Sequence, residues 1–151
     1  MKTGNSRLMA IWRQREVAVI LRRTGKGEKL RLRLPGELEF RIEDQLWLRN
    51  SRPHIPRWRT TESYWEIPKA WFNDFVNRTL DRFGSVYIIQ PYKETEVCAR
   101  ACMEAQGHEC ECSCMGANHG SGMHGSWFEV SDAFAIKSGI PMLACRLLTK
   151  K

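Results

Sequence analysis

Five of the six cysteines and three of the four histidines of this 151-residue chain lie between positions 98 and 124. The segment reads C-x3-C-x7-C-x-C-x-C-x4-H-x4-H, with His108 between the second and third cysteines. Thiolate and imidazole are the side chains that zinc prefers as ligands. A single free cysteine is often a buried apolar side chain, and we expect that role for Cys145, but a protein core does not need five thiols so close together. The segment therefore predicts a bound metal.

The spacing limits which cysteines can share one ion. Cys98 and Cys102 lie four residues apart on an expected helix, 95–106, so both thiols face the same side. In an extended run the outer two cysteines of 110–114 would be roughly 13 Å apart. Thiolates on one zinc, with bonds of ~2.3 Å, lie about 4 Å apart. We expect two of those three cysteines to complete the site, and the candidate ligands are Cys98, Cys102, Cys110, Cys112, Cys114 and His119.

Other metal chemistry fits the segment less well. An iron–sulfur cluster is the alternative to zinc, but Ala105 interrupts the C-x3-C-x2-C pattern and no C-x2-C-x2-C run is present. His119 and His124 in a glycine-rich loop also fit a metal-dependent hydrolase or nuclease, although the zinc deaminase signature is absent. A structural zinc is the favoured interpretation. The segment 98–120 resembles cysteine-rich proteins of bacteria and their mobile elements, and this resemblance implies no activity.

Positive charge is concentrated in the first part of the chain. Residues 1–60 carry 15 Lys or Arg against 6 Asp or Glu, a net charge of +9, whereas residues 61–151 carry 9 against 11, a net charge of −2. A basic half is typical of a surface that binds a polyanion, and it also fits a solvated face that keeps a protein soluble. The candidate nucleic-acid-binding residues are Arg31, Arg33, Arg52, Arg57, Trp58 and Arg59, because guanidinium groups contact phosphates and an indole can stack on a base.

The hydrophobic pattern predicts an α+β fold with a mostly antiparallel sheet. Residues 17–21 and 30–34 form an expected hairpin, and alternation in the second strand puts leucine on one side and arginine on the other. Residues 37–48 are expected to add one or two strands, and residues 49–59 to be extended and irregular. The main helix is expected at 69–83, preceded by Pro68 and followed by Gly84. Strands are expected at 64–67, 85–90 (ended by Pro91), 127–130 with 134–136, and 142–148.

We expect one domain over residues 1–151. Its expected parts are the basic, strand-rich residues 1–60, a strand–helix–strand unit at 61–92, the metal-binding insertion at 93–125 and C-terminal strands at 126–151. No apolar run approaches the ~20 residues that cross a membrane, and the N-terminus lacks the apolar core of ~7–15 residues of a secretory signal. These features favour a cytosolic protein with no membrane partner.

Three functions fit these features, and the sequence does not determine the oligomeric state. The leading hypothesis is a zinc-stabilised protein that binds nucleic acid with little sequence preference through its basic half. The alternative is a protein-interaction module without catalysis, such as an inhibitor, an immunity partner or a subunit, whose basic face binds an acidic protein surface. An enzyme that uses His119 and His124 comes third, because the motifs of the common enzyme classes are absent.

Overall fold

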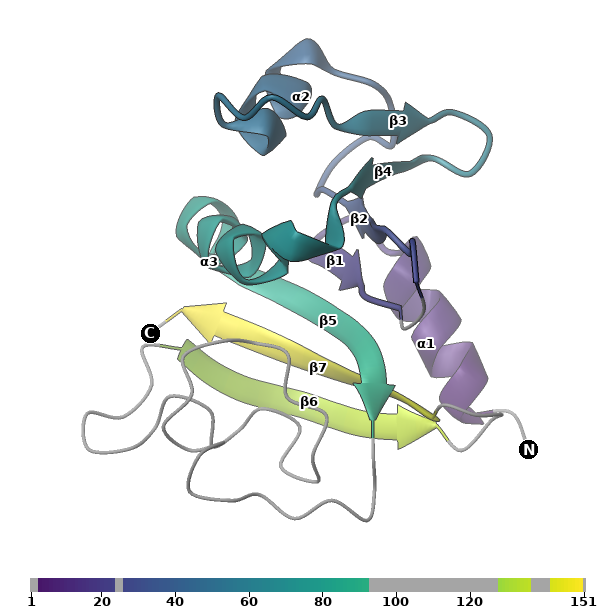
Figure 1. Cartoon of the computed structure of the whole chain (residues 1–151). Coiled ribbons are helices and arrows are strands. Elements are labelled where there is room, and N and C mark those ends of the chain that lie inside the picture. The colour runs from purple at the N-terminus through teal and green to yellow at the C-terminus, as the bar shows by residue number, and fades with distance from the viewer. Residues whose placement is uncertain (1–2, 24–25, 93–127, 137–141, 151) are drawn as a thin grey trace.

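The strands of the chain form one mixed sheet with helices on both faces (Figure 1). The computed structural model describes residues 3–23, 26–92, 128–136 and 142–150. The elements in chain order are α1 (Thr3–Arg13), β1 (Ala18–Leu21), β2 (Leu30–Arg33), α2 (Ile42–Arg49), β3 (Arg57–Arg59), β4 (Tyr64–Ile67), the 3-10 turn η1 (Lys69–Trp71), α3 (Phe72–Phe83), β5 (Ser85–Tyr92), β6 (Phe128–Ile136) and β7 (Met142–Lys150). The predicted α+β class is confirmed, whereas the helix expected at 95–106 lies outside the described residues.

The sheet has the strand order β3-β4-β2-β1-β5-β7-β6. The β1–β5 pair is parallel and all the other pairs are antiparallel, so the predicted mostly antiparallel sheet is confirmed. The expected hairpin is β1–β2. β4 and β5, on either side of α3 in sequence, are separated in the sheet by β2 and β1. The parallel β1–β5 pair therefore brings the N-terminal and C-terminal strands into one sheet.

The larger core lies between α3 and one face of the sheet. α3 buries Phe72, Phe75, Val76 and Leu80 at helical spacing. These side chains pack against a layer from the strands that comprises Ala18, Ile20, Leu30, Leu32, Leu34, Trp65, Ile67, Val86, Ile88 and Leu148. The expected helix at 69–83 is confirmed, with a first turn of 3-10 form. Gly84 ends it at a φ of 85° and donates its backbone N–H to the carbonyl of Leu80.

The second, smaller core lies under α1 on the opposite face. Ile11 of α1 is buried with Val19, Ile89 and Cys145 from three neighbouring strands. Figure 1 shows α1 and α3 on opposite sides of β5. This N-terminal helix was not among the elements expected from the sequence. Its signal is the spacing of Leu8, Ile11 and Trp12, which all pack in this core.

The strands expected at residues 37–48 are wrong, because Ile42–Arg49 form helix α2. The apolar alternation that indicated a strand ends at Ile42. Glu43 and Asp44 follow in the first turn, where their negative charges stabilise a helix by interacting with the positive end of its dipole. Asn50 closes the helix in the left-handed conformation, with a φ of 47°. A short helix therefore forms within the segment where three alternating apolar residues predicted one or two strands.

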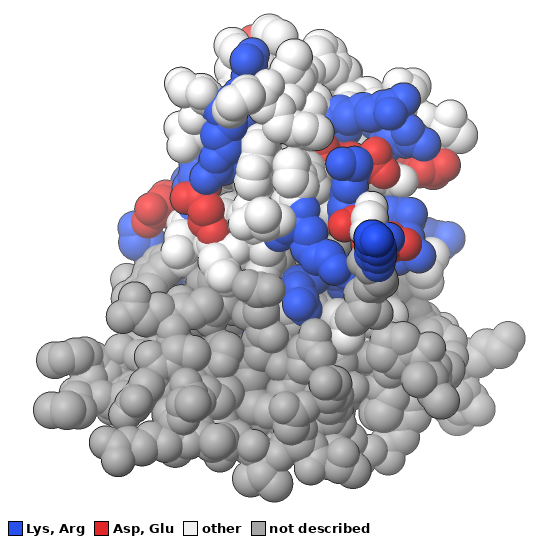
Figure 2. Space-filling model, in the orientation of Figure 1, with Lys and Arg blue, Asp and Glu red and all other residues white. Residues whose placement is uncertain are grey.

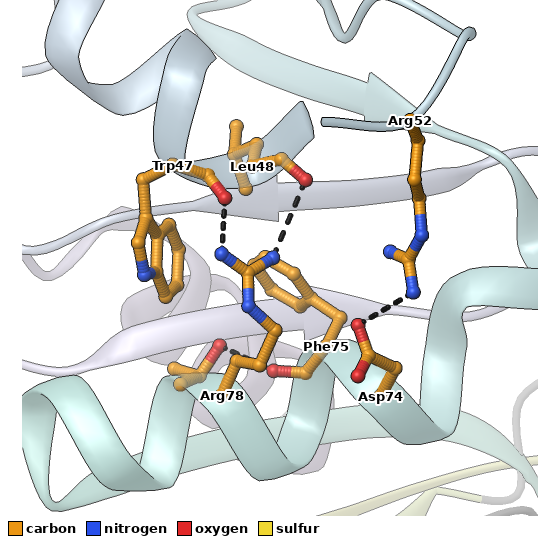
Figure 3. A network of polar contacts seen from close by, with 7 residues as sticks. Trp47, Leu48, Arg52, Asp74, Phe75 and Arg78 are labelled. Atoms are coloured by element: carbon orange, nitrogen blue, oxygen red, sulfur yellow. Dashed lines mark hydrogen bonds and ion pairs between the residues drawn. The ribbon is translucent and has the colours of Figure 1, made fainter. Parts of the chain in front are cut away.

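Arginines of α3 hold α2 against the core. The guanidinium of Arg78 donates to the carbonyls of Trp47 and Leu48 at the C-terminal end of α2, and it lies 4.7 Å from the Trp47 ring centroid (Figure 3). Arg82 lies 4.6 Å from the same centroid and pairs with Asp44 at 3.5 Å. Cations suit the C-terminal end of a helix because its carbonyls lack partners there. α2 is thus attached by these charged contacts, by the Trp47 ring and by Leu48, its one buried side chain.

The expected end of β5 at Pro91 is also wrong, since the strand continues to Tyr92. β1 pairs with β5 only as far as Ile89, so Pro91 pairs with Leu143 of β7 alone among the described residues. Proline is tolerated where the missing N–H would face no neighbouring strand. The expected C-terminal strands are confirmed as β6 and β7, and β6 is a single strand with a register shift between Ser131 and Phe134.

Candidate nucleic-acid interface

Four of the six residues predicted to bind nucleic acid lie on one face of the sheet, over β2, β4 and β3. Arg31 of β2 and Arg57 of β3 both lie opposite Glu66 of β4 in the strand register, so the three side chains form one row across three strands. Arg33 and Arg59 each follow two residues later and lie on the same face. We call Arg31, Arg33, Arg57 and Arg59 the basic face. The alternation of leucine and arginine in β2 correctly predicted which side of the strand is cationic.

Arg33 connects three segments of the chain. Its guanidinium donates hydrogen bonds to the carbonyls of Trp12 at 2.8 Å, Ser63 at 3.0 Å and Glu62 at 2.8 Å. It also lies 4.5 Å from the centroid of the Trp12 ring. Partial burial lowers the pKa of Arg33 from its ordinary value, and the neighbouring charge of Arg13 lowers it further. Arg33 therefore holds α1 and the β3–β4 turn to β2, and contributes its charge to the face from a fixed position.

Arg31 lies over the ring of a buried tyrosine. Its guanidinium carbon is 5.1 Å from the ring centroid of Tyr64, which is only 4% exposed. Burial raises the pKa of Tyr64, and a hydrogen bond with the Glu62 side chain raises it further, while Arg31 acts in the opposite direction. The phenol stays neutral at physiological pH and supports the guanidinium from below.

Arg57 and Arg59 differ from Arg31 and Arg33, because no aromatic ring or carbonyl of the described residues holds their guanidinium groups. Arg57 is exposed and Arg59 is half-buried, on the edge strand of the sheet. Within the described part of the chain, neither guanidinium forms an ion pair or a hydrogen bond. Together with Thr60 and Thr61, and with Trp58 and the acidic Glu62, they line a shallow polar hollow of about 180 Å³. Guanidinium and hydroxyl donors around such a hollow suit a phosphate group.

The other two predicted residues lie on the α3 side. Arg52 pairs with Asp74 of α3 at 2.8 Å (Figure 3). Its guanidinium also lies 4.6 Å from the Trp71 ring centroid. Trp58 points away from the basic face and packs edge-on against Trp65, with 5.3 Å between the ring centroids. Both side chains therefore help to hold the region of α2 and β3 to the core.

Acidic groups interrupt the positive charge. Glu66 lies between Arg31 and Arg57, and Glu62 lies beside Tyr64. In the view of Figure 2, blue and red side chains of the described residues also lie next to one another among uncharged ones. The charge available to a polyanion is therefore local and centred on Arg57 and Arg59. Arg13 of α1, which acts on Arg33, was missed because α1 was not expected.

The predicted zinc ligands lie outside the described residues. Cys98, Cys102, Cys110, Cys112, Cys114 and His119 all belong to residues 93–127, as does His124. Among the residues that the structure does describe, no group of three His, Cys, Asp or Glu side chains is placed to hold a metal ion. Cys145 is 1% exposed in the core under α1, which confirms its predicted role as a buried apolar side chain.

Comparison of the chain with protein-family models, with curated proteins and with solved structures gives no match. Across the described residues, the helices are too short or too polar to cross a membrane.

Proposed function

We propose that this protein binds nucleic acid with little sequence preference through the basic face. The observation that carries the proposal is the pair Arg57 and Arg59, which lie side by side on the sheet edge without an ion-pair partner among the described residues. A guanidinium group that already pairs with a carboxylate gains little binding free energy from a phosphate. An unpaired guanidinium group neutralises the phosphate and releases its counterions, which favours binding. Arg31 lies in the same row and adds a third cation.

The dimensions of the face suit a few phosphates. Residues two apart in a strand are about 6.6 Å apart, and strands two positions apart in a sheet are separated by about 9.6 Å. Phosphates follow one another at about 3.4 Å of rise per strand of a duplex. The face therefore covers two or three phosphates, and contacts to the backbone alone carry no sequence information.

The test is filter binding or fluorescence anisotropy with DNA and RNA of mixed sequence over a series of salt concentrations. The variant Arg57→Gln/Arg59→Gln should weaken binding and reduce the slope of log K against log salt by about 1.4–1.8. A matched control is Arg15→Gln/Arg41→Gln, which removes the same charge from two surface ion pairs, with Glu37 and Glu39. If the parent protein binds neither DNA nor RNA at low salt, the proposal is wrong.

A structural zinc is the second part of the proposal, and the sequence of residues 98–124 supports it. Thiolates of Cys98 and Cys102, with two ligands from Cys110, Cys112, Cys114 and His119, would make a four-coordinate site. Elemental analysis of the purified protein, together with its colour, tests this directly. Zinc in stoichiometric amount supports a structural zinc site. Iron together with visible absorbance would contradict zinc and indicate an iron–sulfur cluster instead.

Exposed apolar side chains favour protein interaction as the second candidate function. Phe40, Ile42, Leu46 and Ile55 are 48%, 51%, 61% and 55% exposed on and around α2. Apolar groups gathered at a protein surface are typical of contacts with other proteins. A pull-down with and without nuclease treatment separates the two candidates. A partner that survives nuclease in stoichiometric amount favours this function, and partners that are lost favour nucleic-acid binding.

A further inference from the structure

A cavity of about 420 Å³ lies between α1 and the sheet, next to the basic face. Most of its wall is apolar, formed by Leu8, Met9, Leu21, Ile89 and Leu143 with the Trp12 ring. Its volume falls within the range of about 300–1,000 Å³ that is typical of small-molecule sites. Because Met9 is 45% exposed, part of this wall is in contact with solvent.

Three polar side chains complete the cavity, and one of them belongs to the basic face. Arg31, Glu62 and Tyr64 line it together. Arg31 offers N–H donors, the Glu62 carboxylate offers acceptor oxygens and the Tyr64 hydroxyl is held by Glu62. The cavity therefore has aliphatic walls with one indole ring among them, and a small set of directional polar groups. Such a combination fits a planar heterocycle better than a flexible acyl chain.

We propose that this cavity takes one unpaired nucleobase of a single-stranded nucleic acid whose phosphates lie on the basic face. This inference rests on the proposed function and names its substrate as a single strand. Arg31 connects the two sites, because it lies in the row with Arg57 and also lines the cavity. A strand that follows the arginines therefore passes the wall of the cavity.

The chemistry of a base matches the wall. A nucleobase has two apolar faces and a polar edge of donors and acceptors, and proteins bind unstacked bases on aromatic rings and guanidinium planes. Arg33 covers one face of the Trp12 ring and Tyr64 one face of the Arg31 guanidinium, and the parts of both groups that line the cavity offer such surfaces. The Glu62 carboxylate can accept from an exocyclic amino group. Bases in a duplex are stacked and paired, so they cannot enter without being extruded. The cavity should therefore favour single strands over duplexes.

The first experiment compares two single strands of equal length and equal charge on the full chain. One is a DNA of mixed sequence, and the other carries abasic sites at every position. Anisotropy at several salt concentrations should give about fivefold or tighter binding for the strand with bases, because one stacked base contributes at least that much. The salt slopes of the two strands should be alike, since their phosphates are the same.

The second experiment fills the cavity. Leu21→Trp places an indole at a half-buried position of the wall, and Leu46→Trp, at a position 61% exposed on α2, is the matched control. Leu21→Trp should bind both strands with the affinity of the parent for the abasic strand, while Leu46→Trp behaves as the parent. If Leu21→Trp does not fold, the comparison of strands on the parent decides.

The two proposals fail in different ways. Equal affinity of the parent for both strands, with the steep salt dependence retained, would overturn the cavity as a base site and leave the basic face in place. Absence of binding by either strand at low salt would overturn the proposed function and the inference with it. Tighter binding of a duplex than of the single strand with bases would also refute the inference.

Discussion

Replacing Arg33 should destabilise the fold, although this residue lies on a cationic surface. Arg33→Met removes hydrogen bonds to three backbone carbonyls and a guanidinium–indole contact at 4.5 Å. Each hydrogen bond contributes about 0.5–1.5 kcal/mol and the ring contact about 0.5–1 kcal/mol. The Glu62 carbonyl is exposed and regains water, so we take the lower part of this range. The expected loss is about 3 kcal/mol of unfolding free energy, or roughly 6–12 °C in melting temperature.

The assay is thermal and urea unfolding of three variants beside the parent. Arg33→Lys keeps the charge but cannot reach three carbonyls that lie around a planar fork, so it should recover less than half of the loss. Arg57→Met makes the same exchange on the edge strand β3, where no ion pair with a described residue is lost, and should melt within about 1–2 °C of the parent. Parent-like melting of Arg33→Lys would refute the argument from hydrogen-bond geometry.

Three further predictions concern single positions. Gly84→Ala should cost about 1 kcal/mol in urea unfolding, because alanine is strained at a φ of 85° although nothing crowds its Cβ. Burial raises the pKa of the Cys145 thiol from 9.0 to about 12, so iodoacetamide at pH 8 should label this thiol only after unfolding. The neutral thiol stabilises the fold fully below pH 9, and this stabilisation is lost between pH 9 and 12. Chemical unfolding at several pH values measures the loss. Cys98→Ser and Cys102→Ser should each lower the melting temperature more than Cys145→Ser does. A zinc site would be contradicted if Cys98→Ser melts at the temperature of the parent and a chelator changes the melting of neither protein.

The elements with strong periodicity were predictable because burial alone determines them. The stripe that includes Phe72, Phe75 and Leu80 indicates a helix whatever its neighbours do, and glycine at position 84 fits its left-handed end. The alternation in β2 likewise gave its buried and cationic faces. In both cases one local pattern and one apolar surface are sufficient.

The two shorter helices were not predicted because distant residues stabilise them. α2 has one buried residue, Leu48, and depends on Arg78, which is 30 positions further along the chain. Among the α1 residues whose burial is described, Ile11 is the buried one, and it packs against strands that include Cys145. Short helices are marginal by their own propensity, so tertiary contacts decide whether they form. A local reading of residues 37–48 finds alternation and cannot include an arginine on α3.

The candidate site was predictable in its residue types and only partly in its geometry. Alternation places Arg57 and Arg59 together on one side of an edge strand, but it does not reveal that Trp58 packs on Trp65 behind them. The Arg52–Asp74 pair joins residues 22 positions apart, which no local pattern indicates. The cavity beside Arg31 needs α1 and strands from both ends of the chain.

The net charge of +9 in residues 1–60 overstates what a polyanion meets. Six of its arginines are already held, four in ion pairs with carboxylates and two by backbone carbonyls: Arg15, Arg23, Arg41, Arg52, Arg33 and Arg49. Arg31, Arg57 and Arg59 are left on one face. If these three contact phosphates, log K should fall against log salt with a slope of about −2 to −3. A slope near −8 would mean that a strand displaces counterions from most of the basic half, and the binding surface would then be far wider than the face built by β2, β4 and β3.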